Sequence, residues 1–558
     1  MSKLPVFLFA LLAAGAAQAQ PAATPTAPAI DPASPPKLIV AISVDQFSAD
    51  LFAQYRQHFT GGLRRLSTGM VFPSGYQAHA ATETCPGHST ILTGSRPARS
   101  GIIANNWFDL SLPREDKRVY CSEDPSVPGS SSSSGRYTVS PHFLRVPTLG
   151  DYMKRTNSQV RVAVVAGKDR AAIMMGGRAV DQRWWWENER FVSNREAQPT
   201  PVVTRTNDAI ARALAAPAPA VAPSAYCQGR SRAVPIQGSE RPMSVGDGRF
   251  AREAGNSRAF RASPELDGAT LALAMGLRDE MRLGQGPATD LLIVGLSATD
   301  YVGHSYGTEG AEMCIQLMEL DRSLGDFFAR LDRTGIDYMV VLTADHGGLD
   351  VPERVRADGG LPSERVSDGL HPTAMGRAIA ADLRIQSERP LYGDGPFGDI
   401  YVDRALPAPV RARVLAEAIR RYRASPQVAR VLTREELIAA PQPTTTPEEW
   451  SLVDRAKASF DPQRSGDFIV FLDPRVTPIP EPGVGYVSTH GSPWEYDRRV
   501  PILFWRRGMT GFEQPLSVET VDILPTLAPY AGITIPAGTI DGRCLDLIEG
   551  PRSSCAAR

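Results

Sequence analysis

The stretch "DLLIVGLSATD" (290–300) decides the fold class. Its aliphatic run, interrupted by one glycine, ends in Ser297 and Asp300. A short continuous run of β-branched and aliphatic residues is typical of a strand that is buried on both faces, as in a parallel sheet. We therefore expect a buried strand here, with Asp300 just beyond its end.

Three other stretches follow the same design. They are "KLIVAISVD" (37–45), "VRVAVVAGKDR" (160–170) and "DYMVVLTADHG" (337–347), and each ends in charged residues. The segment 311–333 has a helical period instead, with apolar residues three and four apart: Met313, Leu317, Leu320, Leu324, Phe327, Phe328 and Leu331. Alternating strands and helices predict an α/β fold, a doubly wound and mostly parallel sheet flanked by helices.

Polar residues stand where these predicted strands end. Sheets of this class bind ligands in the crevice beyond the carboxyl ends of their strands. One polar strand end would indicate only a turn. Four such ends together predict one shared site, and they carry Asp45, Lys168, Arg170, Asp300, Asp345 and His346.

Aspartate and histidine give this set its chemistry. Asp300 and His304 are four residues apart and would share one face of a helical turn. His346 and His490 each precede glycine, which lets the backbone bend sharply. Carboxylate and imidazole suit zinc, with manganese or iron as alternatives.

Six such residues exceed what one tetrahedral ion needs, so two metal ions about 4 Å apart are the economical interpretation. A lone aspartate at a strand end is more often a helix cap, and it is the joint pattern that favours a metal site. The predicted ligands are Asp45, Asp300, His304, Asp345, His346 and His490.

The segment "ATETCPGHSTILTG" (81–94) offers four possible nucleophiles or bases, Thr84, Cys85, His88 and Ser89. It is typical of a turn that enters a helix, where the dipole and free N–H groups favour an anion. A metal ion lowers the pKa of a hydroxyl, so we choose Thr84 as the nucleophile. Without the metal set, Thr84 would be read as a plain helix cap. We expect His88 to pack behind the site.

Six cysteines in an exported chain permit three disulfides. Cys544 and Cys555 close a short loop and are the easiest pair to assign. A catalytic thiol is readily lost in an oxidising compartment, so Cys85 is expected to pack or to pair.

The N-terminus predicts export. Residues 1–19 have one lysine, an apolar run and Ala17-Gln18-Ala19, which fits signal-peptide cleavage before Gln20. An uncleaved anchor is the weaker alternative, and we expect a periplasmic or secreted protein without stable membrane insertion. A Pro/Ala-rich tether follows at 20–36. With 60 Lys+Arg against 61 Asp+Glu, no charge excess indicates a nucleic-acid partner.

Four motifs together carry a family resemblance. They are "TETCPGHSTILTGSRPARSGIIANNWFD" (82–109), "DYVGHSYG" (300–307), "LTADHGG" (342–348) and "STHGSPWEYDRRVPILFW" (488–505). They resemble the alkaline phosphatase superfamily, within it the bacterial phosphomonoesterases that use threonine, and more distantly the nucleotide pyrophosphatase/phosphodiesterases. The resemblance reaches from about residue 37 to 530 and implies an alkaline-phosphatase-like fold.

The resemblance also implies roles for individual residues. Asp45, Thr84, Asp345 and His346 would hold the zinc ion that activates the nucleophile, and Asp300, His304 and His490 the zinc ion on the leaving-group side. Asn105 would donate to a phosphoryl oxygen, with adjacent Asn106 as the alternative. Lys168 and Arg170 match the basic pair of the phosphomonoesterase branch. No ligand set for a third metal is found in the sequence.

The function implied is that of an exported alkaline phosphatase with two zinc ions, which hydrolyses small phosphate monoesters through a phosphothreonine. The main alternative is a phosphodiesterase or nucleotide pyrophosphatase on the same site. A phosphonate hydrolase and a metal-dependent mutase are further alternatives. A sulfatase is disfavoured because Pro86 follows Cys85 directly and no arginine completes that motif. A non-catalytic relative would be expected to lack ligands, and none is missing.

We expect one catalytic domain over 37–545 and a tail at 546–558. Insertions are expected at about 106–145, 181–255 and 405–465, forming a cap or crown. Trp184, Trp185 and Trp186 lie in the second insertion. Packing is the preferred interpretation for them, and a stacking wall for the substrate is the alternative.

Overall fold

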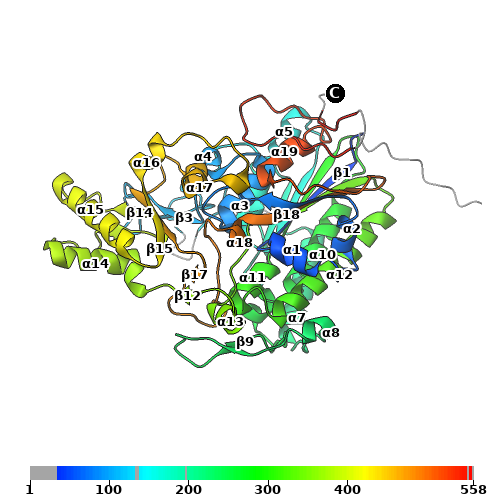
Figure 1. Ribbon diagram of the computed structural model, residues 1–558. Coiled ribbons are helices and arrows are strands. Elements are labelled where there is room, and N and C mark those ends of the chain that lie inside the picture. The colour runs from blue at the N-terminus through cyan, green and yellow to red at the C-terminus, as the bar shows by residue number, and fades with distance from the viewer. Residues whose placement is uncertain (1–33, 132–136, 195–197, 549–551, 556–558) are drawn as a thin grey trace, which may run out of the picture.

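The computed structural model describes residues 34–131, 137–194, 198–548 and 552–555 (Figure 1). The expected signal peptide, most of the tether and part of the Ser-rich loop at 129–135 lie outside these residues and stay predictions. Among the described residues, no helix combines the length and the apolar character needed to cross a membrane.

The four predicted strands lie side by side at the centre of a ten-stranded sheet. They are β1 (Leu38–Val44), β5 (Val162–Ala166), β10 (Asp290–Leu296) and β11 (Tyr338–Thr343), and every residue in them is buried. Their order is β11-β1-β10-β5, and all three pairings are parallel. The prediction of a mostly parallel sheet is confirmed, and the four carboxyl ends meet at one edge.

Antiparallel pairings occur toward both margins of this sheet. β18 (Arg499–Arg506) pairs antiparallel with β11 and with β2 (Met70–Tyr76), beside which β19 (Phe512–Glu513) and β20 (Val518–Glu519) lie. At the other margin β6 (Gln182–Glu187) pairs parallel with β5, and β7 (Arg190–Val192) pairs antiparallel with β6. Residues 182–187 therefore belong to the central sheet, although the expected second insertion begins just before them. Trp184, Trp185 and Trp186 are all buried, which confirms the packing interpretation.

Two apolar cores cover the two faces of the sheet. Alternate residues of β1 enter different cores, with Val40 and Ile42 in one and Ile39 and Ala41 in the other. The first core takes residues from α1 (Ala49–Tyr55), α2 (Gly62–Leu66), α7 (Pro201–Ala215), α10 (Pro264–Glu280) and α12 (Ala311–Arg333). The second takes residues from α3 (Thr84–Thr93), α5 (Leu149–Thr156), α6 (Asp169–Gly176) and α19 (Ile523–Leu527). The sheet is therefore doubly wound, as predicted, and helix α12 has the predicted bounds.

A second, smaller sheet lies apart from the central sheet, at the left of Figure 1. This outer sheet has the strand order β13-β14-β16-β15. Its strands are β13 (Leu391–Tyr392), β14 (Gly398–Val402), β15 (Val428–Thr433) and β16 (Phe468–Leu472). Helices α14 (Pro372–Leu383) and α15 (Ala408–Ala424) pack on it in a core of their own.

The remaining elements are short and connect these layers. They are α4 (Pro97–Ser100), β3 (Asn106–Phe108), β4 (Arg118–Tyr120), α8 (Ala225–Gln228), β8 (Val234–Pro235), β9 (Ser244–Val245), α9 (Ser257–Arg261), α11 (Ala298–Tyr306), α13 (Pro352–Ala357), β12 (Glu364–Arg365), η2 (Asp368–Leu370), α16 (Arg434–Ala439), η3 (Pro447–Glu449), α17 (Leu452–Ser459), β17 (Val476–Thr477), α18 (Glu495–Arg498) and η4 (Thr520–Asp522).

Three disulfides pair all six cysteines. Cys544 and Cys555 form the pair predicted from their spacing, and the others are Cys85–Cys121 and Cys227–Cys314. Cys85 is therefore bonded rather than a free thiol, as expected. Its partner lies just after β4, so this disulfide ties the β3–β4 hairpin to helix α3.

Candidate active site

The polar strand ends converge as the sequence predicted. Asp45 follows β1, Asp345 and His346 follow β11, and α11 begins just after β10 and carries Asp300 and His304. Lys168 is the N-cap residue of α6, directly after β5, and Arg170 lies in the first turn. A loop before α18 supplies His490, and Thr84 opens α3. Every site residue predicted from the sequence thus lies at one edge of the sheet or beside it.

Asp300, His304 and His490 form one group of possible metal ligands, whose ligand atoms all lie within 4.8 Å of one another. Asp300 Oδ1 is 3.3 Å from His304 Nε2 and 3.4 Å from His490 Nε2. Because Asp300 and His304 share a face of α11, the predicted spacing of four places both side chains together.

A second group consists of Asp45, Asp300 and His346. His346 Nε2 is 3.5 Å from Asp45 Oδ1 and 3.3 Å from Asp345 Oδ2, so Asp345 borders the same space. The family resemblance implies Asp345 in this set and Asp300 only in the other. In the structure, Asp300 contributes to both groups.

The three histidines are oriented by backbone carbonyl groups. The Nδ1 atoms of His304, His346 and His490 lie 2.8, 2.8 and 2.9 Å from the carbonyl oxygens of Ser488, Gly347 and Thr82, respectively. A carbonyl oxygen only accepts, so each Nδ1 carries the hydrogen and donates it. In the neutral ring, Nε2 then presents a lone pair toward the carboxylates, which is the arrangement found in metal-binding histidines.

Several buried oxygen and nitrogen atoms of the site are arranged as ligands of a cation would be. Asp45 Oδ1, Asp300 Oδ1 and His346 Nε2 are buried and have no hydrogen-bond partner among the described residues. Burial lowers the pKa of His346 to about 3, so its Nε2 atom accepts rather than donates. Acceptors that face one another in a buried site need a cation between them. The donor set of carboxylate oxygen and imidazole nitrogen therefore fits the expected metal ions.

Several charged side chains lie close together in this site. Burial, followed by the carboxylate of Asp345, raises the pKa of Asp45 well above its usual range. The ammonium group of Lys168 offsets part of this charge, since Nζ is 2.6 Å from Asp45 Oδ2 and 2.5 Å from Asp300 Oδ2. Burial alone would lower the pKa of Lys168, but Asp300 and Asp45 raise it. Lys168 thus contacts predicted metal ligands, whereas the resemblance implies a contact with the phosphoryl group.

Thr84 is the first residue of α3 and is fully buried. Arg170 Nη2 lies 3.5 Å from Thr84 Oγ1, and the neighbouring Asp169 carboxylate accepts a hydrogen bond of 2.8 Å from the Tyr120 hydroxyl. The expectation of free N–H groups at this helix start is only partly met. The Cys85 N–H donates to Asn105 Oδ1, and Pro86 has no N–H. Side chains must therefore supply most donors for an anion here.

The adjacent asparagines point to different places. Asn105 Oδ1 is held by the Cys85 N–H at 2.8 Å, and the Asn105 side chain lines the cleft beside Arg170. Asn106 Nδ2 instead donates to Asp394 Oδ2 at 3.0 Å. The geometry favours Asn105 as the donor to a phosphoryl oxygen.

His88 lies behind the site, as expected, with Nδ1 3.0 Å from Asp345 Oδ2. Glu83 also borders the site, although it was not predicted from the sequence as a site residue. Its carboxylate accepts the Asn105 N–H at 2.5 Å, lines the cleft, and has a pKa raised to about 7 by burial. No spacing or motif distinguishes Glu83 from an ordinary helix N-cap, so only the fold identifies it.

The fold thus brings two groups of possible metal ligands together at the carboxyl ends of the central strands, near the start of α3. Residues 39–493 match the family model described as Type I phosphodiesterase / nucleotide pyrophosphatase. The match spans most of the chain, which therefore belongs to this family within the alkaline phosphatase superfamily. The resemblance inferred from the motifs is confirmed.

Among the relatives, this chain is 57% identical to alkaline phosphatase PhoK of Sphingomonas sp over 529 residues, which are 94% of each chain. It is 49% identical to alkaline phosphatase PhoD of Zymomonas mobilis over 531 residues, 95% of this chain and 91% of that protein. The crystal structure of alkaline phosphatase PafA superposes with a TM-score of 0.78 at 25% identity, covering 91% of this chain and 98% of that one.

Proposed function

We propose that this protein is an exported alkaline phosphatase that hydrolyses phosphate monoesters through a phosphothreonine at Thr84. The observation that carries the proposal is a cluster of three carboxylates and three imidazoles at one sheet edge, in contact with α3 through Asp345 and His88. The relatives named alkaline phosphatases support monoester chemistry. Three disulfides support an oxidising compartment.

Two zinc ions per chain are the proposed cofactors. Asp45, Thr84, Asp345 and His346 would hold one, and Asp300, His304 and His490 the other. When bound, the two ions would lower the pKa of the threonine hydroxyl and offset the charge that develops on the leaving oxygen. The unpartnered inward atoms of Asp45, Asp300 and His346 support this assignment.

The proposed reaction has two displacements at phosphorus. Thr84 Oγ1 attacks in line, the bond to the alcohol oxygen breaks, and the alcohol leaves toward His304 and His490. Water then attacks the phosphothreonine, releases inorganic phosphate and restores the Thr84 hydroxyl. Asn105 and Arg170 donate to the non-bridging oxygens, which carry the charge in phosphoryl transfer.

A variant structure of PafA supports the choice of these residues. In that variant, a threonine is replaced by serine, and an asparagine, a lysine and an arginine are replaced by alanine. The threonine and asparagine are 21 residues apart there, and the lysine and arginine are two apart. Thr84 and Asn105, and likewise Lys168 and Arg170, have the same separations in this chain.

A phosphodiesterase is the second candidate, because the matching family model carries that description. The basic pair of buried Lys168 and half-buried Arg170 favours monoesters. A monoester presents three non-bridging oxygens and almost two charges, whereas a diester presents two oxygens and one charge. The extra oxygen needs a donor, since its desolvation is otherwise uncompensated. Comparing monoester and diester turnover by the zinc-loaded protein tests this choice, and a preference for diesters would reverse it.

Replacing both Lys168 and Arg170 by alanine should lower monoester kcat/KM far more than diester kcat/KM. Each charged contact that strengthens in the transition state is worth about 2–4 kcal/mol, roughly 30- to 1000-fold in rate. Steady-state kinetics on one monoester and one diester with the same leaving group measures the difference.

The matched control is the double replacement of Lys154 and Arg155 by alanine, a basic pair in the last turn of α5. This control should leave both substrates unchanged. Because Lys168 also contacts Asp45 and Asp300, the metal content of each variant must be measured as well. Equal losses on both substrates, with metal retained, would mean that the pair does not discriminate between them.

A further inference from the structure

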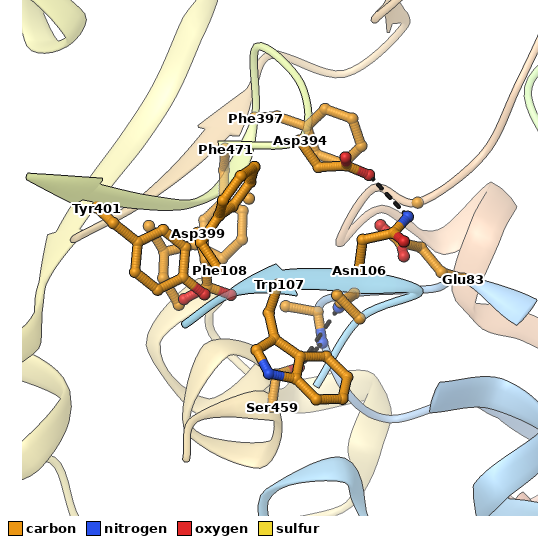
Figure 2. Close-up of a pocket in the computed structure, with 16 residues that line it drawn as sticks. Glu83, Asn106, Trp107, Phe108, Asp394, Phe397, Asp399, Tyr401, Ser459 and Phe471 are labelled. Carbon is orange, nitrogen blue, oxygen red and sulfur yellow. Dashed lines mark hydrogen bonds between the residues drawn. The ribbon is translucent and has the colours of Figure 1, made fainter. Parts of the chain in front are cut away.

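An aromatic pocket lies between the β3 strand and the outer sheet (Figure 2). Five aromatic side chains line it: Trp107 and Phe108 from β3, Phe397 from the loop before β14, Tyr401 from β14 and Phe471 from β16. Phe108 contacts Tyr401 with ring centroids 5.9 Å apart. The catalytic region and the outer sheet thus build this pocket jointly.

The charges in the pocket wall are all negative. Glu83, Asp394 and Asp399 line the pocket, and no lysine or arginine is among the described lining residues. Asp394 is partly balanced by Arg118, at 2.8 Å, and by the Asn106 amide. Asp399 accepts the Gly466 N–H at 2.7 Å. A neutral apolar group fits these walls better than an anionic group, because Asp394 and Asp399 are acidic and no lysine or arginine is among the described lining residues.

The aromatic pocket adjoins the catalytic cleft, which is lined by Asn105, Arg170, His304 and His490. Both spaces share Glu83, Asn106, Asp394 and Phe397 as walls. Figure 2 shows Phe397, Asp394, Asn106 and Glu83 together at one end of the pocket. A group that leaves toward His304 and His490 would therefore pass directly beside Phe397.

The junction between the aromatic pocket and the catalytic cleft is narrow at Gly491. It follows His490, has a φ of +110°, and lines the pocket. A Cβ atom at this position would lie 3.1 Å from the Phe397 ring. The space that connects the two sites therefore depends on the absence of a side chain at Gly491 and on the position of one aromatic ring.

We propose that the aromatic pocket binds the alcohol portion of the substrate, so that the enzyme favours monoesters whose alcohol carries an apolar ring and no negative charge. This inference rests on the proposed monoesterase function and adds the substrate class. Phe397 is its specificity-determining residue, because its ring borders both the cleft and the pocket.

The test compares three substrates: ethyl phosphate, benzyl phosphate and 4-carboxybenzyl phosphate. Their alcohols differ little in acidity, so differences in kcat/KM report binding of the alcohol portion. We expect benzyl phosphate to exceed ethyl phosphate by roughly tenfold or more, as one buried ring allows. We expect 4-carboxybenzyl phosphate to lose most of this advantage.

Phe397→Ala should reduce the ratio of benzyl to ethyl kcat/KM by about tenfold. Phe512→Ala is the matched control, since this phenylalanine is 48% exposed on β19 and lines neither space. Asp394→Asn should raise relative turnover of 4-carboxybenzyl phosphate about threefold or more, because one repelling charge is lost. Asp382→Asn, an exposed carboxylate paired with Arg421 at 2.5 Å, is its control.

The outcomes separate the two proposals. If the wild-type enzyme turns over none of the three esters, the proposed monoesterase function is wrong. If all three are hydrolysed at similar kcat/KM, or if Phe397→Ala changes benzyl and ethyl phosphate equally, the pocket does not bind the alcohol. Retained ethyl phosphate turnover shows that the variant is folded, and the inhibition constant of benzylphosphonate gives a second measure of ring binding.

Discussion

Thr84→Ala should lower monoester kcat/KM by about ten-thousandfold or more, the usual scale for loss of a catalytic nucleophile. The hydroxyl is buried at the start of α3 beside Arg170, and the nearby residues Thr82 and His88 contact His490 and Asp345, respectively. The three other candidates in the segment "TETCPGHS" are engaged elsewhere, and among them the Ser89 hydroxyl donates to the Pro86 carbonyl oxygen. Cys85 is held in a disulfide, and His88 is engaged with Asp345. Steady-state hydrolysis of a simple monoester measures the loss.

Two further variants make this result specific. Thr84→Ser keeps a hydroxyl at the same atom and should keep much of the turnover. Thr93→Ala, at the other end of α3, removes a buried hydroxyl of the same helix and should affect stability by about 1 kcal/mol rather than activity. Near-normal turnover by Thr84→Ala would exclude it as the nucleophile.

The covalent intermediate can also be observed directly. An acid quench during turnover should preserve phosphothreonine, and intact-mass analysis should show a phosphate-sized addition that maps to the peptide containing Thr84. The addition should be absent from Thr84→Ala. If the phosphate addition maps to another residue, that residue is the nucleophile and the assignment of Thr84 is wrong.

The central sheet could be predicted because its strands carry the signal in their own composition. The four aliphatic runs form β1, β5, β10 and β11. The segment 311–333, which has a helical period, forms α12 with the same bounds. The metal-ligand candidates could be predicted for a related reason. Parallel strands bring their carboxyl ends to one edge, so residues more than 400 positions apart in the chain, such as Asp45 and His490, line one site.

Other features depend on contacts that leave no local pattern. Glu83 is distinguished by its burial and by the Asn105 N–H, and neither follows from its neighbours in sequence. The aromatic pocket requires β3 to meet strands near residues 400 and 470, a packing that periodicity does not encode. The place of Asp300 in both ligand groups also depends on such contacts. The spacing in the sequence predicts only that Asp300 lies beside His304, and the family resemblance assigns it to one group.

Removal of the metal ions should abolish turnover, and added zinc should restore it. The hydrogen-bond contact to Thr84 Oγ1 comes from Arg170, and a guanidinium group cannot accept a proton. Among the described residues, no carboxylate or imidazole hydrogen-bonds to Thr84 Oγ1, so we expect metal ions to be needed to lower the pKa of this hydroxyl. Chelator treatment followed by dialysis and zinc titration measures this dependence. Full activity of the metal-free protein would overturn the two-metal interpretation.

Metal content and stability give readouts that do not depend on activity. Elemental analysis should find about two zinc ions per chain in the wild type. His304→Ala and His346→Ala, which belong to different ligand groups, should each lose about one, and His371→Ala, outside both groups, should lose none. Asp300 contributes to both groups and would not separate them.

Without metal, the carboxyl groups of Asp45, Asp300 and Asp345 would face one another. Their repulsion, which adds to burial in raising the pKa of Asp45, should lower Tm by several degrees even though Lys168 and His88 offset part of the charge. Zinc should reverse that loss, because ligands that bind only the folded state stabilise it. An unchanged Tm on metal removal would show that the carboxylates are balanced within the protein and that the site does not require cations to fold.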